Sequence, residues 1–363
     1  MERRTFIKTV VGASLATEIS RAQTPAVPAR KLGWALVGLG SLSTNQIAPA
    51  LLKTQHCQLA AIVTGTPAKA VKWREKYGLT EKQVYDYANF DKIIDDPNID
   101  VVYIVLPNGM HHEFVIRAAK AGKHVFCEKP MANTAQECRE MVAACDAAKK
   151  RLGIGYRCQF EPHHVEAMRF AREKVFGEVV HVDAGFGFKI GDPTQWRLNG
   201  KLAGGGALMD VGVYALQACR YLIGEEPSEI SAIETKTDKV KFAQVDETIQ
   251  WLMKFPSGRT ANCTTTYNFN GLNYFSATAE KGRFGMDPAY SYAGLKGWTK
   301  DAAHPLDFAD TDHFLTEMDA FSEAILTDKP FAQSGVEGLR DLLVIDAIYR
   351  SIASGKTEPV AAV

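Results

Sequence analysis

The stretch Trp34-Ala-Leu-Val-Gly-Leu-Gly-Ser-Leu-Ser43 decides the fold of this chain. A short apolar run ends in a glycine turn, and a helical pattern continues from there through Leu52. Strand, glycine turn and helix in this order are the context of a dinucleotide-binding fingerprint. Gly38 allows the tight turn, and Gly40 lets the backbone approach a pyrophosphate at the helix N-terminus. The third fingerprint position is Ser43 rather than Gly or Ala, so the match is imperfect.

Further apolar runs follow this turn and alternate with helical stretches. The runs cover residues 59–63, 101–106, 125–127 and 152–155, and apolar stripes of helical spacing occur at 114–119 and 138–148. Strands that alternate with helices are typical of an α/β fold with a doubly wound parallel sheet. We therefore predict a dinucleotide-binding Rossmann domain over residues 31–158.

After about residue 160 the pattern changes to longer runs with a period of two. They cover residues 179–188, 230–237, 248–255 and 260–268, and two helices are expected at 314–326 and 336–352. We predict a substrate and oligomerisation domain of the α+β class over residues 159–363, with a large, mostly antiparallel open sheet. Because a broad apolar sheet face is rarely left in water, we expect its outer face to form a homodimer or homotetramer contact.

Length and composition exclude several classes of protein. A chain of 363 residues favours two domains, and 46% apolar with 23% charged residues is typical of a globular protein. The 42 basic and 42 acidic side chains balance, so there is no overall electrostatic footprint for nucleic acid. No run of about 18 apolar residues occurs, and we therefore expect no membrane span.

The cysteines and the paired histidines indicate neither disulfides nor a metal. The seven cysteines form no Cys-x-x-Cys pair, so most are expected to be buried small hydrophobes or free thiols. The pairs His111-His112 and His163-His164 are neighbours on predicted helices, and neighbours do not face one site. We predict no metal.

The first thirty residues are typical of an export signal rather than of a fold element. Arg3 and Arg4 precede a modestly apolar run at 9–16, and Ser20-Arg-Ala22 offers a cleavage site. We interpret residues 1–30 as a twin-arginine signal and arm, which predicts a periplasmic protein exported already folded with its cofactor. The alternative is a basic, structureless tail.

The end of the second strand favours NADP over NAD. An NAD site usually has a carboxylate here that binds the ribose hydroxyls, whereas this chain has Ala61-Ile-Val-Thr-Gly-Thr66 followed by Lys69. Hydroxyls and a lysine can hold a 2′-phosphate. The alternative is that Lys69 is only a solvated charge at a helix start.

Two further motifs point to chemistry. Cys127-Glu-Lys-Pro130 lies at the carboxyl end of a predicted parallel strand, where open α/β sheets bind ligands. In Leu202-Ala-Gly-Gly-Gly-Ala-Leu-Met-Asp-Val-Gly-Val-Tyr214 the glycines allow close backbone approach, and Asp210 and Tyr214 share a helix face. The alternatives are a helix cap for Asp210 and a core aromatic for Tyr214.

With these motifs the chain resembles the Gfo/Idh/MocA family of sugar oxidoreductases over nearly all of its length after residue 30. Most of that family has a histidine where this chain has Tyr214, and tyrosine is typical of its glucose-fructose oxidoreductase branch. Further segments similar to that branch are 85–90, 107–111, 156–158 and 195–198.

The resemblance implies a cofactor site. A serine, a lysine and a tyrosine hold the 2′-phosphate end in that branch, and the matching residues here are Thr64, Lys69 and Tyr87. Asn108 could instead cap the helix that starts near Met110. The cofactor-binding candidates are Gly38, Leu39, Gly40, Ser41, Leu42, Thr64, Lys69, Tyr87, Pro107, Asn108, His111, Glu128, Lys129 and Arg157.

The resemblance also places Lys129, Asp210 and Tyr214 around a nicotinamide. A free tyrosine has a pKa of about 10 and is a poor base, but a nearby ammonium lowers that pKa. We predict Tyr214 as the general acid and base, with Lys129 lowering its pKa and polarising the sugar oxygen. Asp210 would accept hydrogen bonds from sugar hydroxyls. Further candidates for the sugar pocket are Arg157, Trp196 and Arg197, for which solvated surface roles are the alternative.

The activity that the resemblance implies is NADP-dependent oxidation of an aldose to its lactone, followed by reduction of a second sugar with the same tightly bound NADPH. Glucose with fructose is the leading pair. The alternatives are an aldose-aldose oxidoreductase, a sugar dehydrogenase that releases NADPH, a non-catalytic dinucleotide sensor, and a glycosidase that uses transient oxidation. Tyr214 in place of histidine disfavours the glycosidase.

Overall fold

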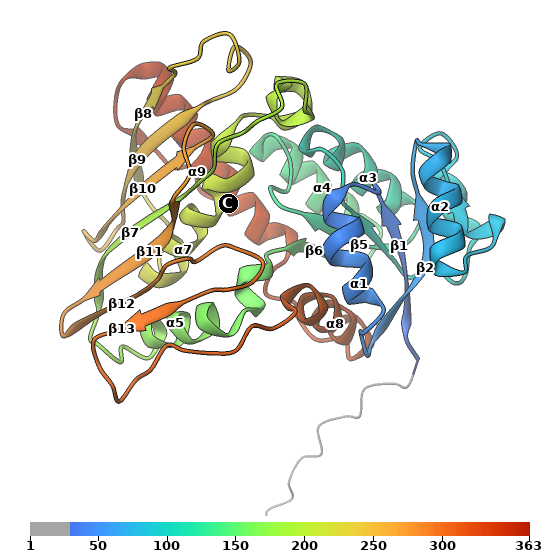
Figure 1. Cartoon of the computed structure of the whole chain (residues 1–363), viewed down its shortest axis with the longest axis horizontal. Coiled ribbons are helices and arrows are strands. Elements are labelled where there is room, and N and C mark those ends of the chain that lie inside the picture. The colour runs from blue at the N-terminus through green and yellow to red at the C-terminus, as the bar shows by residue number, and fades with distance from the viewer. Residues whose placement is uncertain (1–29) are drawn as a thin grey trace, which may run out of the picture.

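The structure is a computed structural model that describes residues 30–363 (Figure 1). The predicted twin-arginine signal and all but the last residue of the arm lie outside the described residues. Within 30–363, no helix has both the length and the apolar character needed to span a bilayer.

The first sheet consists of parallel strands in the order β3-β2-β1-β4-β5-β6. This doubly wound order reverses between β1 and β4, and such a switch point is where open α/β sheets bind dinucleotides. The strands are β1 Leu32–Val37, β2 Cys57–Val63, β3 Val84–Tyr85, β4 Val101–Ile104, β5 His124–Glu128 and β6 Leu152–Gly155. The predicted Rossmann sheet is confirmed, and only the two-residue edge strand β3 lacked a signal in the sequence.

Helices cover both faces of this sheet, and two of them come from the end of the chain. The helices from within the first domain are α1 Ala48–Leu51, α2 Pro67–Tyr77, α3 His111–Lys120 and α4 Ala135–Ala147. From the C-terminal part, α8 (His313–Leu326) buries Met318 and Phe321 in one core cluster with Trp34. The Trp34 indole donates to the Ser322 hydroxyl at 3.1 Å. The long helix α9 (Gly335–Ser354) contacts α4, so the last two helices join the two domains.

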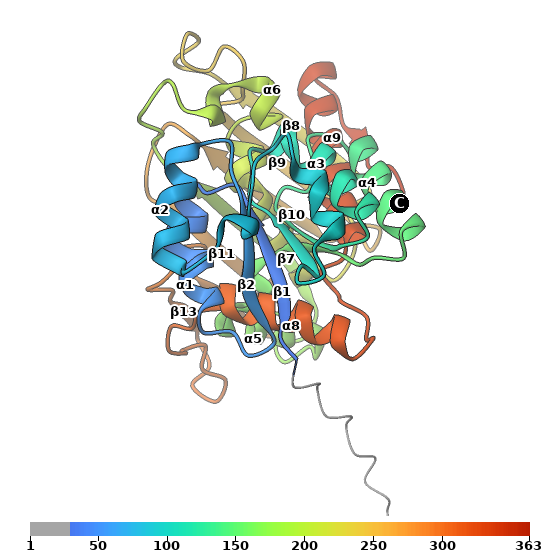
Figure 2. The same cartoon turned by 90° about the vertical axis from the view of Figure 1, so that its right-hand side faces the viewer.

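The second sheet has the order β13-β12-β11-β7-β10-β9-β8-β14 and is mostly antiparallel, as predicted. The exception is the parallel pair β7 and β10. The strands are β7 Val179–Gly187, β8 Glu229–Thr235, β9 Thr248–Lys254, β10 Thr260–Thr266, β11 Leu272–Ala279, β12 Gly282–Met286, β13 Gly297–Thr299 and β14 Glu358–Pro359. Figure 2 shows β1 and β2 of the first sheet in front of this second sheet.

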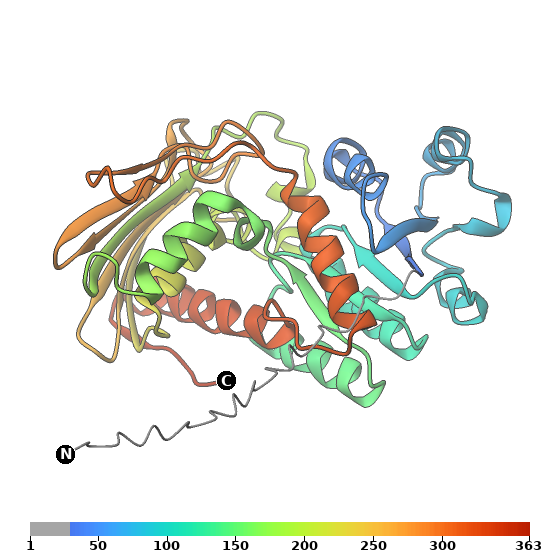
Figure 3. The same cartoon turned by 90° about the horizontal axis from the view of Figure 1, so that it is seen from below.

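Helices α5 (Pro162–Arg172), α7 (Val213–Ile223) and α9 cover the inner face of the second sheet. Seen from below, the green α5 and the red α9 lie between the two sheets (Figure 3). Among residues 30–363 no helix covers the outer face, which exposes Ile233 and Leu252 by 59% and 42%. The expected oligomer contact on this face stays a prediction.

Candidate active site

The glycine turn after β1 has the shape that a bound dinucleotide requires. Gly38 has a φ of +90°, and a Cβ there would lie 2.3 Å from the Val105 carbonyl oxygen, so only glycine fits. The Ser43 hydroxyl donates to the Gly38 carbonyl at 2.5 Å, which explains why a serine is tolerated at the third fingerprint position. A Cβ on Gly40 would meet no atom within 4 Å, so the space above the turn is open to a ligand.

Side chains suited to a phosphate gather at the ends of β2 and β3. Thr64 is buried, and its hydroxyl oxygen accepts from the Thr66 backbone N–H at 3.2 Å. The Tyr87 ring lies against Gly65, where a Cβ would be 2.8 Å from the ring. Lys69 is exposed in the first turns of α2. These residues fit the 2′-phosphate end of NADP, because they offer hydroxyls and a cation and no carboxylate.

Asn108 and His111 bind neighbouring main chain rather than capping a helix or facing the pocket. The Asn108 amide donates to the Ala203 carbonyl at 2.8 Å, which joins the loop after β4 to the second domain. The alternative that Asn108 caps the helix near Met110 is therefore wrong, because no side chain caps either helix start there. The His111 ring nitrogens lie 2.8 and 3.0 Å from the carbonyls of Leu106 and Pro130, and burial lowers the pKa of the imidazole.

Three predicted residues converge at the carboxyl end of β5. The Lys129 ammonium donates to the Asp210 carbonyl at 2.7 Å and lies 3.9 Å from that residue's carboxylate. It also lies 4.6 Å from the centroid of the Tyr214 ring. All three line a pocket of about 280 Å³, together with Arg157, Arg197 and several aromatic residues. The pocket therefore presents an ammonium, a carboxylate and a phenol to one small molecule.

The cation that contacts the Tyr214 hydroxyl is Arg157. Its Nε donates to the phenol oxygen at 3.1 Å, and its other nitrogens donate to the carbonyls of Tyr290 and Ser291 at 2.5 and 3.2 Å. Burial raises the pKa of Tyr214, and the Arg157 charge opposes this only in part. The expected low pKa of Tyr214 is wrong, because burial outweighs the nearby positive charge, and the cation that opposes burial most is Arg157 rather than Lys129.

Asp210 is ionised and keeps one oxygen free for a ligand. Burial alone would raise its pKa, but the charges of Arg197 and Lys129 lower it. Arg197 and the Tyr267 hydroxyl both donate to Oδ2 at 2.8 Å. No described residue donates a hydrogen bond to Oδ1, which can therefore accept from a hydroxyl in the pocket. Trp196 does not line the pocket and instead stacks against the Arg197 guanidinium at 4.7 Å.

The remaining candidates do not line this pocket. Glu128 is buried at the end of β5 and accepts from the Tyr103 hydroxyl at 2.7 Å, and burial raises the pKa of this carboxyl. Leu39 is buried, Ser41 is exposed, and Leu42 and Pro107 are half-buried. Sequence reasoning missed Tyr267 and Tyr292, and the only available signal for Tyr267 was its place at the end of a predicted strand.

Asp246 holds the glycine-rich segment that positions Asp210. A Cβ on Gly206 would lie 1.9 Å from the Asp246 carbonyl, so the two segments pass too close for any other residue. The Asp246 carboxylate accepts from the backbone N–H groups of Gly206 and Leu208 at 2.6 and 2.9 Å and from the Tyr349 hydroxyl at 2.7 Å. The π-helical turn Leu208–Gly212 then leads into α7.

We expect Asp246→Ala to lower the free energy of unfolding by about 3 kcal/mol, because it leaves two buried backbone donors and the half-buried Tyr349 hydroxyl without a partner. Asp246→Asn keeps the size and one acceptor oxygen and should lose about half as much. Denaturant unfolding monitored by circular dichroism measures both. A loss below about 1 kcal/mol for the alanine variant would show that this carboxylate does not hold the segment.

The histidine pairs behave differently from each other. His111 and His112 bind different partners, as expected, and the Nε2 atom of His112 lies 2.7 Å from the Glu140 carboxylate. His163 and His164 instead share one partner, because the Nδ1 atoms of both rings bind the Glu161 carboxylate, at 2.6 and 2.8 Å. The prediction fails here because Glu161 precedes α5, and its two oxygens can reach both rings from the helix end. Within residues 30–363, no group of three or more His, Cys, Asp or Glu side chains is arranged to hold a metal ion.

Comparisons with known proteins agree with this architecture. Residues 32–156 match the GFO/IDH/MocA model of an oxidoreductase family with an NAD-binding Rossmann fold, and residues 164–285 match the GFO/IDH/MocA C-terminal domain. A D-xylose 1-dehydrogenase [NADP(+)] from Haloarcula marismortui is 30% identical over 89% of this chain and 92% of that protein.

Solved structures give the same result. An aldose-aldose oxidoreductase from Caulobacter crescentus, complexed with glycerol, has a TM-score of 0.86 and 44% identity over 91% of this chain and all of that one. A levoglucosan dehydrogenase in complex with NADH and levoglucosan has a TM-score of 0.78 at 23% identity, over 92% of this chain and 100% of that one. At that identity the second likeness shows the fold alone.

Proposed function

The chain belongs to the GFO/IDH/MocA oxidoreductase family, and we propose that it is an NADP-dependent sugar oxidoreductase that retains its cofactor through successive turnovers. It oxidises one aldose at the anomeric carbon to a lactone and reduces a second sugar to an alditol. The observation that carries this proposal is the convergence of Lys129, Asp210 and Tyr214 in one pocket beside the Rossmann sheet.

The pocket residues supply binding and proton transfer. When bound, the nicotinamide supplies the hydride chemistry. Because the Tyr214 oxygen accepts from Arg157, its own proton is free to be donated to the oxygen of a sugar carbonyl. Lys129 stabilises negative charge on that sugar oxygen, and the free oxygen of Asp210 holds a neighbouring hydroxyl. In the oxidative direction, Tyr214 takes up the hydroxyl proton, and the charge of Arg157 favours the phenolate that this requires.

An aldose is the better candidate for the second sugar than fructose. The Caulobacter protein that is 44% identical is named for oxidation and reduction of aldoses, and the Haloarcula relative is named for an aldose and NADP. We therefore propose that one aldose type serves as both donor and acceptor, with fructose as the alternative acceptor.

The choice of NADP gives a prediction at Lys69. Lys69→Ala should weaken NADP binding about tenfold, which corresponds to the loss of one charge-assisted contact with a phosphate, and should leave NAD binding nearly unchanged. Lys72→Ala, on the same exposed helix, is the matched control and should change neither affinity. Calorimetric titration with both nucleotides measures this. An equal loss for NAD and NADP would contradict a role at the 2′-phosphate.

Retention of the cofactor is tested with the purified protein and xylose alone, without added nucleotide. Xylonate and xylitol should form in equal amounts. In a second reaction with xylose and fructose, hexitols in place of xylitol would identify fructose as the acceptor. If product forms only after NADP⁺ is added, and NADPH is released into solution, the protein is a simple dehydrogenase. No product under either condition would favour the sensor.

We also propose that the exposed outer face of the second sheet joins subunits. Its support is the pair of exposed apolar side chains at Ile233 and Leu252, on a face that no helix within residues 30–363 covers. Light scattering on the intact protein and on Ile233→Lys should show an assembly that the charged residue disrupts. A wild-type monomer would contradict this proposal.

We propose that residues 1–30 direct export to the periplasm by the twin-arginine route, and Arg3 and Arg4 support this. Arg3→Lys combined with Arg4→Lys should retain the protein in the cytoplasm, as measured by cell fractionation. Unchanged distribution of the double variant would contradict the proposal.

A further inference from the structure

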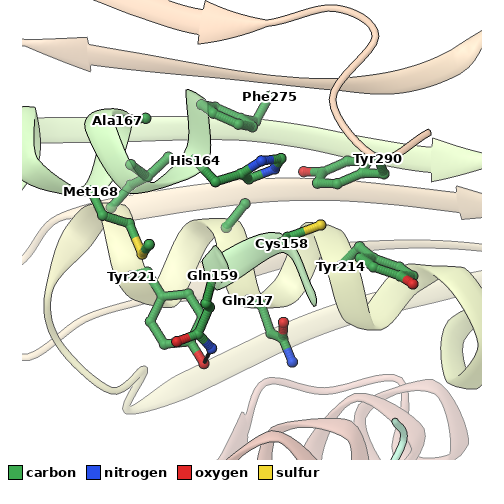
Figure 4. Close-up of a pocket in the computed structure, with 12 residues that line it drawn as sticks. Cys158, Gln159, His164, Ala167, Met168, Tyr214, Gln217, Tyr221, Phe275 and Tyr290 are labelled. Carbon is green, nitrogen blue, oxygen red and sulfur yellow. Dashed lines mark hydrogen bonds between the residues drawn. The ribbon is translucent and has the colours of Figure 1, made fainter. Parts of the chain in front are cut away.

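A second pocket lies beside the candidate active site and shares the rings of Tyr214 and Tyr290 with it (Figure 4). Its other walls come from the turn Arg157–Phe160, from α5 and from α7. The cavity of about 20 Å³ has room for one water or a similarly small molecule. Most of its lining is apolar, including Ala167 and Phe275. The pocket therefore suits a small, uncharged molecule.

Two buried polar atoms on this pocket have no nitrogen or oxygen partner among the described residues. They are Nε2 of His164 and the hydroxyl of Tyr290, on side chains that are 8% and 2% exposed. Figure 4 shows the His164 ring and the Tyr290 hydroxyl turned toward each other, with the Cys158 sulfur beside them. Because an unpaired buried polar group is costly, this arrangement indicates a small hydrogen-bonding occupant.

The opposite side of the His164 ring is fixed by a carboxylate. Glu161 Oε2 lies 2.8 Å from Nδ1 and accepts from the His164 backbone N–H at 3.0 Å. Carboxylate, imidazole and thiol thus follow one another toward the cavity, an order typical of an activated cysteine. Arg157, the residue before Cys158, adds a buried positive charge beside the thiol.

These neighbours outweigh the effect of burial on the Cys158 thiol. The charges of Arg157 and His164 lower the pKa of Cys158, and that of His164 is raised to about 9. All seven cysteines are free and buried, and burial raises the pKa of the thiols at Cys57, Cys127, Cys138, Cys145 and Cys263. The charged and titratable groups that face the Cys158–His164 pair are Arg157, Glu161, Tyr214, Tyr290, His313 and Glu317.

We propose that Cys158 is a peroxide-sensitive modification site, at which hydrogen peroxide in the small pocket oxidises the thiolate to a sulfenic acid. The thiolate sulfur attacks one peroxide oxygen, a sulfur–oxygen bond forms, and the oxygen–oxygen bond breaks. The leaving hydroxide takes the proton of the His164 imidazolium and departs as water. Sulfur is oxidised and peroxide is reduced, so one peroxide is consumed for each thiol. This site does not depend on the identity of the sugar or of the cofactor.

The test treats the folded, full-length protein with hydrogen peroxide and traps sulfenic acid with dimedone. Peptide mass mapping should find the adduct on Cys158 and on none of the other six cysteines. Between pH 6 and pH 8 the rate of adduct formation should rise clearly less than that of an ordinary thiol with a pKa of about 8.5, which would react roughly 75-fold faster at pH 8. Absence of the adduct on Cys158, or the pH profile of an ordinary thiol, would overturn the proposal.

Variants distinguish activation of the Cys158 thiol by its neighbours from simple access of peroxide to a buried thiol. Cys158→Ser should abolish the adduct, and Cys145→Ser, which removes another buried thiol, should leave it unchanged. His164→Gln should slow the reaction at least tenfold at pH 6, because it removes both the charge and the proton donor. An unchanged rate in a folded His164→Gln protein would overturn the role of the imidazole. Should this variant fail to fold, the pH profile of the unaltered protein still decides the proposal.

Discussion

Replacing Lys129 by alanine should lower turnover about 10³-fold while the purified protein still holds its cofactor. The Lys129 ammonium lies over the Tyr214 ring, as the Arg157 guanidinium also does, and beside the Asp210 carboxylate at the end of strand β5. Its loss removes the charge that stabilises an oxyanion on the sugar but leaves the glycine turn and the 2′-phosphate end intact. Product analysis with xylose measures turnover, and the nucleotide released on denaturation measures retention.

Lys201→Ala is the matched control for this prediction, since Lys201 is exposed on the short helix α6 (Gly200–Ala203). It should keep ordinary turnover. Near-normal turnover of Lys129→Ala would remove Lys129 from the catalytic group. Loss of bound cofactor in parallel with activity would instead assign it to cofactor binding.

Tyr214→Phe should lower turnover by about 10²–10⁴-fold, the range expected for removing a general acid and base. The substitution should also change how the rate of lactone formation depends on pH. Burial raises the pKa of Tyr214, so the phenol is protonated at neutral pH, and the small fraction of phenolate grows about tenfold for each unit of pH. In the intact protein, lactone formation in a single turnover should therefore rise with pH from 6 to 9. In the variant this rise should disappear.

The control for Tyr214 is Tyr274→Phe, which removes a hydroxyl that bonds to Asp183 away from the pocket. It should retain both the rate and the rise with pH. Stopped-flow measurement of NADPH absorbance after mixing the NADP⁺ form with xylose follows the oxidative half-reaction. A Tyr214→Phe protein that keeps the slope of the wild type would show that another group takes the proton.

Much of the first domain could be predicted because its signals are local. Each central strand is an apolar run, and the glycine turn at Gly38 lies at the switch point of the sheet. The strands β11 to β13 were missed because they are short or rich in polar residues and glycine, and their pairing depends on neighbours far away in the sequence. The parallel pairing of β7 with β10 also has no local pattern.

The three central members of the site were predictable, but its electrostatics were not. The family resemblance placed Lys129, Asp210 and Tyr214 together, and the pocket contains all three. The pKa of Tyr214 depends on how deeply the ring is buried and on which cation reaches its oxygen, and neither follows from spacing. The Arg157–Tyr214 hydrogen bond joins residues 57 positions apart. Likewise, no pattern revealed that Glu161 would bind two adjacent histidines.

The most direct test is a crystal structure of the protein with NADP⁺ and xylose bound together. The account predicts that the Lys129 ammonium and the Tyr214 hydroxyl both lie within hydrogen-bond distance of the oxygen on the anomeric carbon, and that this carbon faces the nicotinamide ring. A sugar bound so that only one of these two groups reaches it, or bound away from the nicotinamide, would contradict the assignment of this pocket as the site of sugar oxidation.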